Sequence, residues 1–62
     1  MNQIQAIKDG AKQEARARKE HDESRAHEAH RHTMRMIRLE DNPVSAMRIY
    51  TEAYREESGF KL

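Results

Sequence analysis

The sequence predicts an all-α protein, and three observations lead to this fold class. Strong helix formers (Ala, Arg, Lys, Glu and Gln) dominate residues 8–33. Only two glycines and one proline occur among the 62 residues, so the chain offers few points where a helix would break. Charges of opposite sign alternate along the chain, as is typical of helices with a solvated face. We expect a helical hairpin in a single domain over residues 1–62, with a long charged first helix and a shorter amphipathic second one.

The first helix is predicted to run from about residue 3 to residue 40. Glu14 and Arg18 form a favourably oriented i,i+4 pair, and further acid–base pairs at helical spacing follow them. Gly10 is the one turn signal inside this helix, because a glycine within a helix costs about 1 kcal/mol relative to alanine. Two alternatives stay open at this stage: the helix continues through Gly10, or it restarts there.

The turn between the two predicted helices falls at Asp41–Pro43. Asn42 is a favourable N-cap, and Pro43 suits the first helical position, where its missing N–H costs nothing. The second helix is therefore expected over residues 43–57. A broad apolar stripe along it can face the end of the first helix.

The C-terminal end of the second helix is predicted from its glycine. Gly59 is the expected C′ residue, because glycine adopts the left-handed conformation that commonly ends a helix. Phe60 would then fold back onto the helix in a Schellman-type end, within a short tail over residues 58–62.

The chain has little material for a hydrophobic core. Its mean hydropathy is −1.20 and 37% of its residues are charged. Because there is no cysteine, disulfides and thiolate zinc sites are excluded as a means of stabilising so small a fold. We therefore expect self-association or a partner protein to complete the fold. A long first helix would otherwise leave Ala11 and Ala15 uncovered.

Composition and motifs argue against several classes of function. The longest apolar run is Met36-Ile37, so we expect no signal peptide, no membrane span and a cytoplasmic location. The two glycines, Gly10 and Gly59, stand alone and cannot form a phosphate-binding loop. No hydroxyl side chain sits in a nucleophile elbow. We expect no enzyme activity, no cofactor and no small-molecule substrate.

The leading hypothesis is a protein–protein interaction module: an adaptor, assembly factor or inhibitor of the kind common in phages and mobile elements. Methionine gives an adaptable apolar surface, and tyrosine brings contact area together with a polar tip. Arginines spaced i, i+4 and i+7 can dock an acidic partner. The candidate partner-binding residues, for another protein or a second copy of the chain, are Met34, Ile37, Arg31, Arg35, Arg38, Met47, Tyr50 and Tyr54.

Nucleic-acid binding is the alternative hypothesis. Arg31, Arg35 and Arg38 lie in an acid-free stretch and could straddle a phosphate backbone. Against this, the net charge is only +1 and no aromatic residue interleaves with the basic stretch. A face paired with neighbouring carboxylates would explain the arginines equally well.

The histidines offer one candidate metal site. Glu23, His27 and His30 are spaced four and three residues apart, so all three could reach one ion from the same side of a helix. The established helical metal motifs are missing from the sequence. We therefore expect no metal, and interpret these residues as solvated helix side chains.

Overall fold

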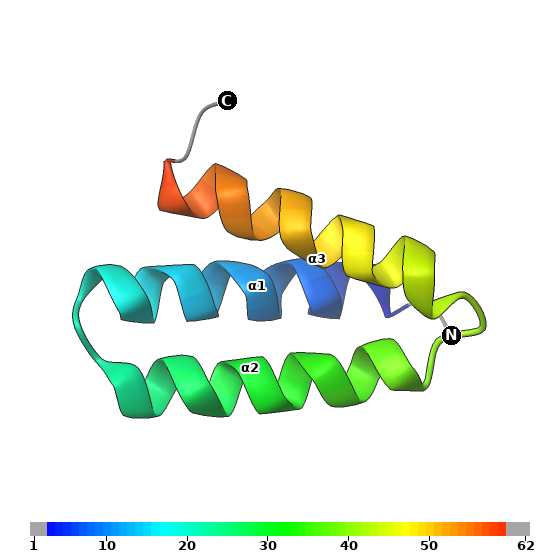
Figure 1. Ribbon diagram of the computed structural model, residues 1–62, viewed down its shortest axis with the longest axis horizontal. Coiled ribbons are helices and arrows are strands. Elements are labelled where there is room, and N and C mark those ends of the chain that lie inside the picture. The colour runs from blue at the N-terminus through cyan, green and yellow to red at the C-terminus, as the bar shows by residue number, and fades with distance from the viewer. Residues whose placement is uncertain (1–2, 60–62) are drawn as a thin grey trace.

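The computed structural model describes residues 3–59, which form three α-helices of 16 residues each and no strand. They are α1 (Ile4–Lys19), α2 (Glu23–Arg38) and α3 (Pro43–Ser58). Figure 1 shows α2 running back along α1, and α3 returning along the opposite edge of α1. The all-α prediction is confirmed. The two-helix hairpin is wrong, because the predicted long first helix is two separate helices, α1 and α2. All three helices have 16 residues, so no helix within residues 3–59 is the long one expected.

The unpredicted break lies between α1 and α2, at residues 20–22. His21 adopts a left-handed backbone conformation with φ 60°, which reverses the chain. Asp22 then caps α2, because its side chain accepts a hydrogen bond of 3.2 Å from the Arg25 N–H. Gly10, the break considered from the sequence, lies inside a continuous α1.

The second turn and both of its signals match the prediction. The Asn42 side chain accepts a hydrogen bond of 3.2 Å from the Ser45 N–H, and Pro43 opens α3. At the other end of α3, Gly59 has a φ of 75°, the left-handed conformation expected of it. The expected fold-back of Phe60 lies outside the described residues.

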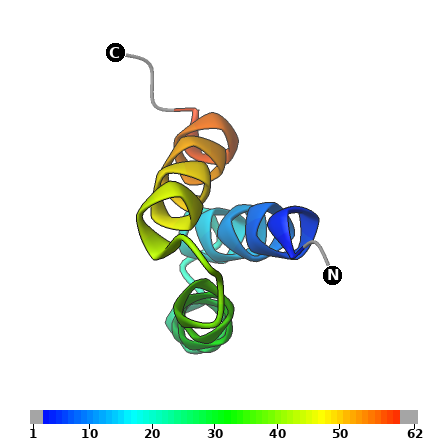
Figure 2. The same cartoon turned by 90° about the vertical axis from the view of Figure 1, so that its right-hand side faces the viewer.

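The break has a clear physical benefit, because it lets α1 pack against a helix on each side. Figure 2 shows α2 and α3 on two different sides of α1, with α2 below it and α3 above it. Ala11 and Ala15, expected to stay uncovered without another chain, are at most 1% exposed. The same chain supplies their cover, so alanine carries much of the core.

The α1–α2 packing is close enough to require a glycine. A Cβ placed on Gly10 would collide with Thr33 Oγ1 and would lie 3.2 Å from Thr33 Cβ. Thr33 is itself fully buried and donates a hydrogen bond of 2.8 Å to the Ala29 carbonyl. Gly10 therefore serves helix–helix contact rather than a turn.

The larger apolar residues meet near the α2–α3 turn, where the C-terminal end of α2 and the N-terminal end of α3 pack against α1. The buried centre of this cluster is Ile7, Ile37 and Ala46. Met34, Met36, Ile49 and Tyr50 pack against it and are partly buried. Among the described residues, none of the helices has the length and apolar character that crossing a membrane requires.

Candidate functional site

α2 and α3 lie on two different sides of α1 and leave an angle between them (Figure 1 and Figure 2). Both helices pack along α1, but they make few contacts with one another. In Figure 2, α3 lies above α1 and α2 lies below it; we refer to the sides of these two helices that border the angle as its walls. The molecule is accordingly thin in one direction, with extents of 33 × 27 × 15 Å. We call this angle the α2–α3 notch, with α1 as its floor. Glu14, Arg18, Tyr50, Tyr54 and Arg55 line a groove along it, and His30 contacts Glu14 and Tyr50. Helical spacing adds four residues on the same sides of α2 and α3: Arg31, Met34, Arg38 and Met47.

A polar network lies at the centre of the notch floor and joins all three helices. Glu14 of α1 is only 3% exposed. The Tyr50 hydroxyl of α3 donates to Glu14 Oε1 at 2.5 Å, and His30 Nδ1 of α2 lies 3.2 Å from the same oxygen. Arg18 donates to the other carboxylate oxygen at 3.3 Å. The buried carboxylate is thus fully partnered, as burial of a charge requires.

The network keeps its tyrosine protonated and its arginine charged. Burial, followed by the hydrogen bond to Glu14, raises the pKa of the Tyr50 phenol well above its usual value. The pKa of Arg18 is also raised, first by its electrostatic interaction with Tyr54 and then by the hydrogen bond to Glu14. Half of the Arg18 side chain remains exposed, so it presents a cation to the notch.

Aromatic and aliphatic side chains form the α3 wall. The rings of Tyr50 and Tyr54 lie 6.2 Å apart, and His30 meets Tyr50 edge-on at 6.2 Å. Met47 precedes Tyr50 by one helical turn and is 41% exposed. A groove of about 520 Å³ follows this wall; its lining residues are Glu14, Arg18, Tyr50, Thr51, Tyr54, Arg55 and Ser58.

The α2 wall is more basic. Met34 follows His30 by four residues and therefore lies on the same side of α2. Arg31 and Arg38 stand three residues before and four residues after Met34, so they flank it on that side. Both arginines are exposed, whereas Met34 is partly buried.

Of the predicted partner-binding residues, Tyr50 and Tyr54 line the groove along α3, and helical spacing places Met34, Met47 and Arg38 on the sides of α2 and α3 that border the notch. Arg31 borders the notch and also lines a hollow on the outer side of α2, whereas Ile37 and Arg35 lie elsewhere. Ile37 is 4% exposed and belongs to the core cluster. Arg35 is exposed on the outer side of α2, where it lines a shallow hollow of about 470 Å³ together with Ser24, His27, Glu28, Arg31 and His32.

The ion pairs around these arginines are not those considered from the sequence. Among the described residues, none of Arg31, Arg35 and Arg38 forms an ion pair with a carboxylate. The pairs that do form involve Arg16 with Glu57, Arg18 with Glu14, and Arg25 with Glu20 and Asp22. The charges of these three arginines are therefore not neutralised by an ion pair within residues 3–59.

The candidate metal ligands do not gather at one point. Over residues 3–59, no three His, Cys, Asp or Glu side chains are placed to share a metal ion. His30 is turned toward Glu14 and Tyr50, while His27 lines the outer hollow. The outer side of α2 thus carries histidines, but the described residues form no group of metal ligands there.

Sequence reasoning missed Glu14 as a site residue. It was interpreted as half of a surface pair with Arg18, but it is the acceptor for three side chains. Its position between Ala11 and Ala15 was the available signal, because a carboxylate in the small-residue face of a helix must find partners when that face is buried.

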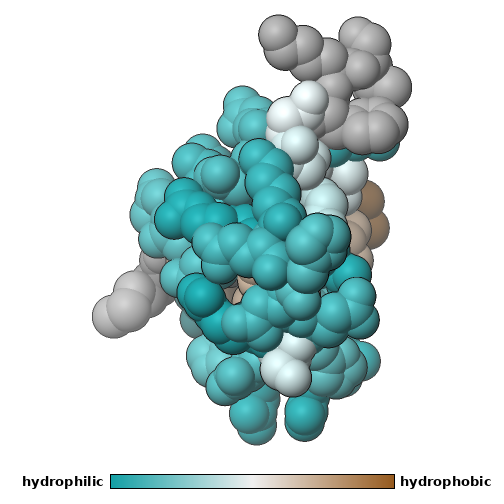
Figure 3. Space-filling view, turned by 90° about the vertical axis from the view of Figure 1, so that its left-hand side faces the viewer, coloured by the Kyte–Doolittle hydropathy of each residue, from teal (hydrophilic) through white to brown (hydrophobic). Residues whose placement is uncertain are grey.

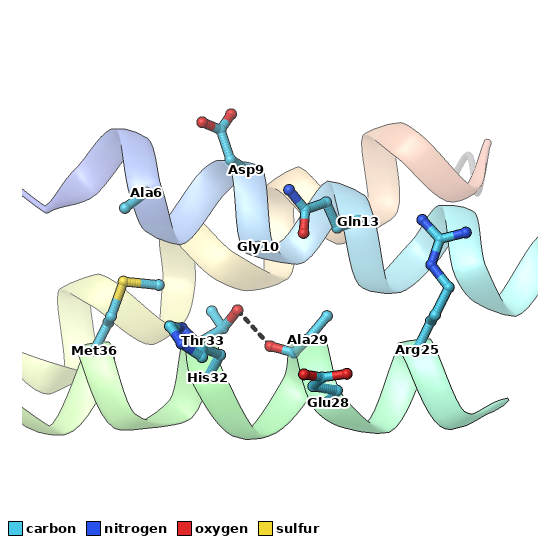
Figure 4. A pocket seen from close by; sticks show the side chains of 10 residues that line it. All are labelled: Ala6, Asp9, Gly10, Gln13, Arg25, Glu28, Ala29, His32, Thr33 and Met36. Atoms are coloured by element: carbon cyan, nitrogen blue, oxygen red, sulfur yellow. Dashed lines mark hydrogen bonds between the residues drawn. The ribbon is translucent and has the colours of Figure 1, made fainter. Parts of the chain in front are cut away.

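A second groove, on the far side of α1 from α3, has a different character. It measures about 480 Å³ and lies between α1 and α2. Figure 4 shows Gly10, Ala6 and Ala29 along it, with Asp9, Gln13, Arg25 and Glu28 toward its edges. Its walls lack large aromatic groups and mix charges of both signs, so it offers less for a partner to bury than the notch does.

No protein-family model matches this chain, and no significant match was found among curated proteins or solved structures.

Proposed function

We propose that this protein is a non-catalytic protein-binding module that uses the α2–α3 notch to occupy the surface of a partner. The observation that carries the proposal is the position of the large apolar side chains. Tyr50, Tyr54 and Met34 stay partly exposed along the notch, while alanines, together with Ile7 and Ile37, fill the space between the helices. A fold that keeps its largest side chains at an open angle is suited to burying them against another molecule.

The chemistry of these side chains supports the proposal. Met47 offers a flexible, polarisable surface that adapts to different contours. Tyr50 and Tyr54 bring a large area with few rotatable bonds, which is why tyrosine is enriched at interfaces. Figure 3, which shows the end of the molecule at the α1–α2 turn, is mostly hydrophilic, and the most hydrophobic residues visible in this view lie at one edge.

The surroundings of the notch extend its apolar surface. Over residues 3–59, the large apolar side chains with the greatest exposure are Leu39, Val44 and Met47, at 71%, 75% and 41%. All three lie at the α2–α3 turn or in the first turns of α3. Binding at the notch would act by steric occupation, as an adaptor, assembly factor or inhibitor does, in a cytoplasmic setting.

The test is a matched pair of substitutions in α3. Met47→Glu places a carboxylate in the notch, whereas Ser45→Glu adds the same charge at an exposed position on the other side of the helix. We expect Met47→Glu to abolish partner capture from the source cells, or concentration-dependent self-association in sedimentation, and Ser45→Glu to preserve it. Circular dichroism confirms that both variants fold. Equal binding by the two variants would contradict the proposal.

A second candidate function is nucleic-acid binding through Arg31, Arg35 and Arg38. The observation that favours it is the absence of ion pairs to these arginines within residues 3–59. It predicts retardation of RNA or DNA in a gel, a steep loss of affinity with salt, and a further loss on Arg35→Glu. No retardation at low salt would rule it out.

A further inference from the structure

We infer that the partner of the α2–α3 notch is an acidic amphipathic α-helix, which lies diagonally opposite α1 and completes a four-helix bundle. This inference rests on the proposed function and adds the shape and charge of the bound element. Three lines of observation carry it: the vacant helix position, the spacing of the apolar residues, and the sign of the charges around them.

The helix arrangement leaves one position of a bundle vacant. In a four-helix bundle every helix packs against two neighbours, and the helix diagonal to it makes no direct contact. α1 packs extensively against both of its neighbours, whereas α2 and α3 make few contacts with each other, such as that of His30 with Tyr50. An element that packs against α2 and α3 together would occupy the fourth position of such a bundle. Walls of 16 residues are about 24 Å long, so a bound helix of about four turns would follow their length.

The apolar residues of the walls are spaced for contact with a helix. Met47, Tyr50 and Tyr54 follow the i, i+3, i+7 pattern along α3. Met34 faces them from α2, four residues after the His30 ring that touches Tyr50. Such a strip matches the apolar face of an amphipathic helix, which presents anchors at the same spacing.

The charges at the edges of this strip are positive. Arg18 reaches the notch from its floor, and Arg55 lines the groove along α3. Arg31 and Arg38 flank Met34 on α2 and have no carboxylate partner among the described residues. A helix with carboxylates beside its apolar face would pair with these guanidinium groups.

The acids near the notch do not cancel this charge. Glu14 is already engaged by Tyr50, His30 and Arg18. Glu23 acts on Arg18 from the first turn of α2, at one end of the notch. Glu52 and Glu56 are exposed one turn apart and, by helical spacing, lie on the side of α3 turned away from Tyr50 and Tyr54.

A second copy of this chain fits the notch less well than a separate acidic helix. α1 and α2 are both cationic, and their apolar faces are already used within the fold. The outer side of α3 carries Glu52 and Glu56 beside Arg48, without an apolar strip. Within residues 3–59 no exposed helix face combines an apolar strip with a row of acids, so the inference commits to a helix of another protein.

The test uses three synthetic helical peptides of about 18 residues, long enough to follow the notch. All carry leucine at i, i+3, i+4 and i+7, and their polar faces carry glutamate, glutamine or lysine. Titration calorimetry measures the affinity at low and moderate salt, and NMR shift changes locate the contact. We expect the glutamate peptide to bind at the notch at least ten times more tightly than the lysine peptide, and to weaken as salt rises.

Two matched variants of α2 sharpen the test. Arg38→Glu reverses a charge that flanks the notch, whereas Arg35→Glu makes the same change on the outer side of the helix. We expect Arg38→Glu to weaken the glutamate peptide about tenfold, and Arg35→Glu to leave it nearly unchanged. Met47→Glu should weaken both the glutamate and the glutamine peptides, because it disrupts the apolar strip.

The outcomes separate this inference from the function beneath it. If the glutamine peptide binds as tightly as the glutamate peptide and Met47→Glu abolishes both, the acidic partner is wrong and the protein-binding notch stands. If no peptide shifts the notch residues, the inference is overturned; the proposed function fails as well only if Met47→Glu leaves partner capture unchanged. If single-stranded RNA binds in place of the peptides and Arg35→Glu weakens it as much as Arg38→Glu, the surface is a nucleic-acid site and the inference is overturned.

Discussion

The side of α2 and α3 that faces α1 differs sharply from the side that faces the notch. Toward α1 most of the buried residues are small: Ala26 and Thr33 on α2, and Ala46 and Ala53 on α3, with Ile37 as the large exception. Toward the notch the side chains are large, charged or aromatic and remain partly exposed. The same two helices thus close one interface tightly and leave the other open. Alanine brings the helices together without using the larger residues, which become available for binding.

The largest effect should come from the one point where the closed side holds a large side chain. Ile7 is fully buried in the cluster with Ile37 and Ala46. We expect Ile7→Ala to lower the free energy of unfolding by about 2–5 kcal/mol, because it removes buried methyl groups and leaves a cavity. Urea denaturation measures this loss. Val44→Ala, at a residue 75% exposed, is the control and should change stability by less than about 0.5 kcal/mol.

The closed α1–α2 contact should resist even a single methyl group. Gly10→Ala gains about 1 kcal/mol of helix propensity but drives its Cβ into Thr33, and overpacking of this kind costs about 1–3 kcal/mol. We expect net destabilisation in a thermal melt. Combining it with Thr33→Ala removes the colliding hydroxyl, so the double variant should be more stable than the sum of the single changes indicates. Simple additivity would show that the two helices do not meet there.

The turn that makes the closed side possible should depend on its cap. Asp22→Ala removes the acceptor for the Arg25 N–H and should destabilise the protein by about 1 kcal/mol. Replacing the left-handed His21 with glycine should stabilise it by about 0.5–1 kcal/mol, since glycine adopts that conformation without steric cost. Chemical denaturation resolves both. If the two changes moved stability in the same direction, a turn at residues 20–22 would be contradicted.

The smallest effect concerns the open side and appears only at high pH. The pKa of Tyr50 is raised in the folded protein above its ordinary value of 10.0, so the unfolded chain loses this proton first. The stabilising contribution of Tyr50 is therefore complete below about pH 10 and declines as the pH rises further. Tyr50→Phe should flatten that decline in melts recorded from pH 8 to pH 11. If stability declined equally in the Tyr50→Phe variant, ionisation of Tyr50 would not be its cause.

How far the sequence predicted this structure depends on the range of the signals. The local ones succeeded: Asn42, Pro43 and Gly59 each act within one turn of the backbone, and the structure uses them as expected. The turn at residues 20–22 was missed because its residues also favour a charged, continuous helix; His21 adopts its backbone conformation only because α1 and α2 gain contact on either side. Asp22 was the available signal, but a lone N-cap inside a helical pattern is easily outweighed by propensity.

The residue types of the candidate site could be predicted from the sequence, but which of its residues are buried could not. The methionines, tyrosines and arginines of the notch are recognisable as interface residues from their chemistry alone. The role of Gly10 and the burial of Glu14 depend on which faces of α1 become covered, and that is decided by a three-helix arrangement the hairpin prediction did not contain. Ile37 was counted with the surface for the same reason, because its helix stripe was assigned only one neighbour.

Because the two walls scarcely touch, the angle between them is governed by the floor. Ala11 and Ala15 set how closely α3 approaches α1, and Gly10 sets the approach of α2. Enlarging one of these hidden residues would tilt a wall without altering any atom that a bound molecule meets. Substitutions at these buried residues can therefore change which partners fit the notch, and a mutational scan limited to the contact surface would not include them.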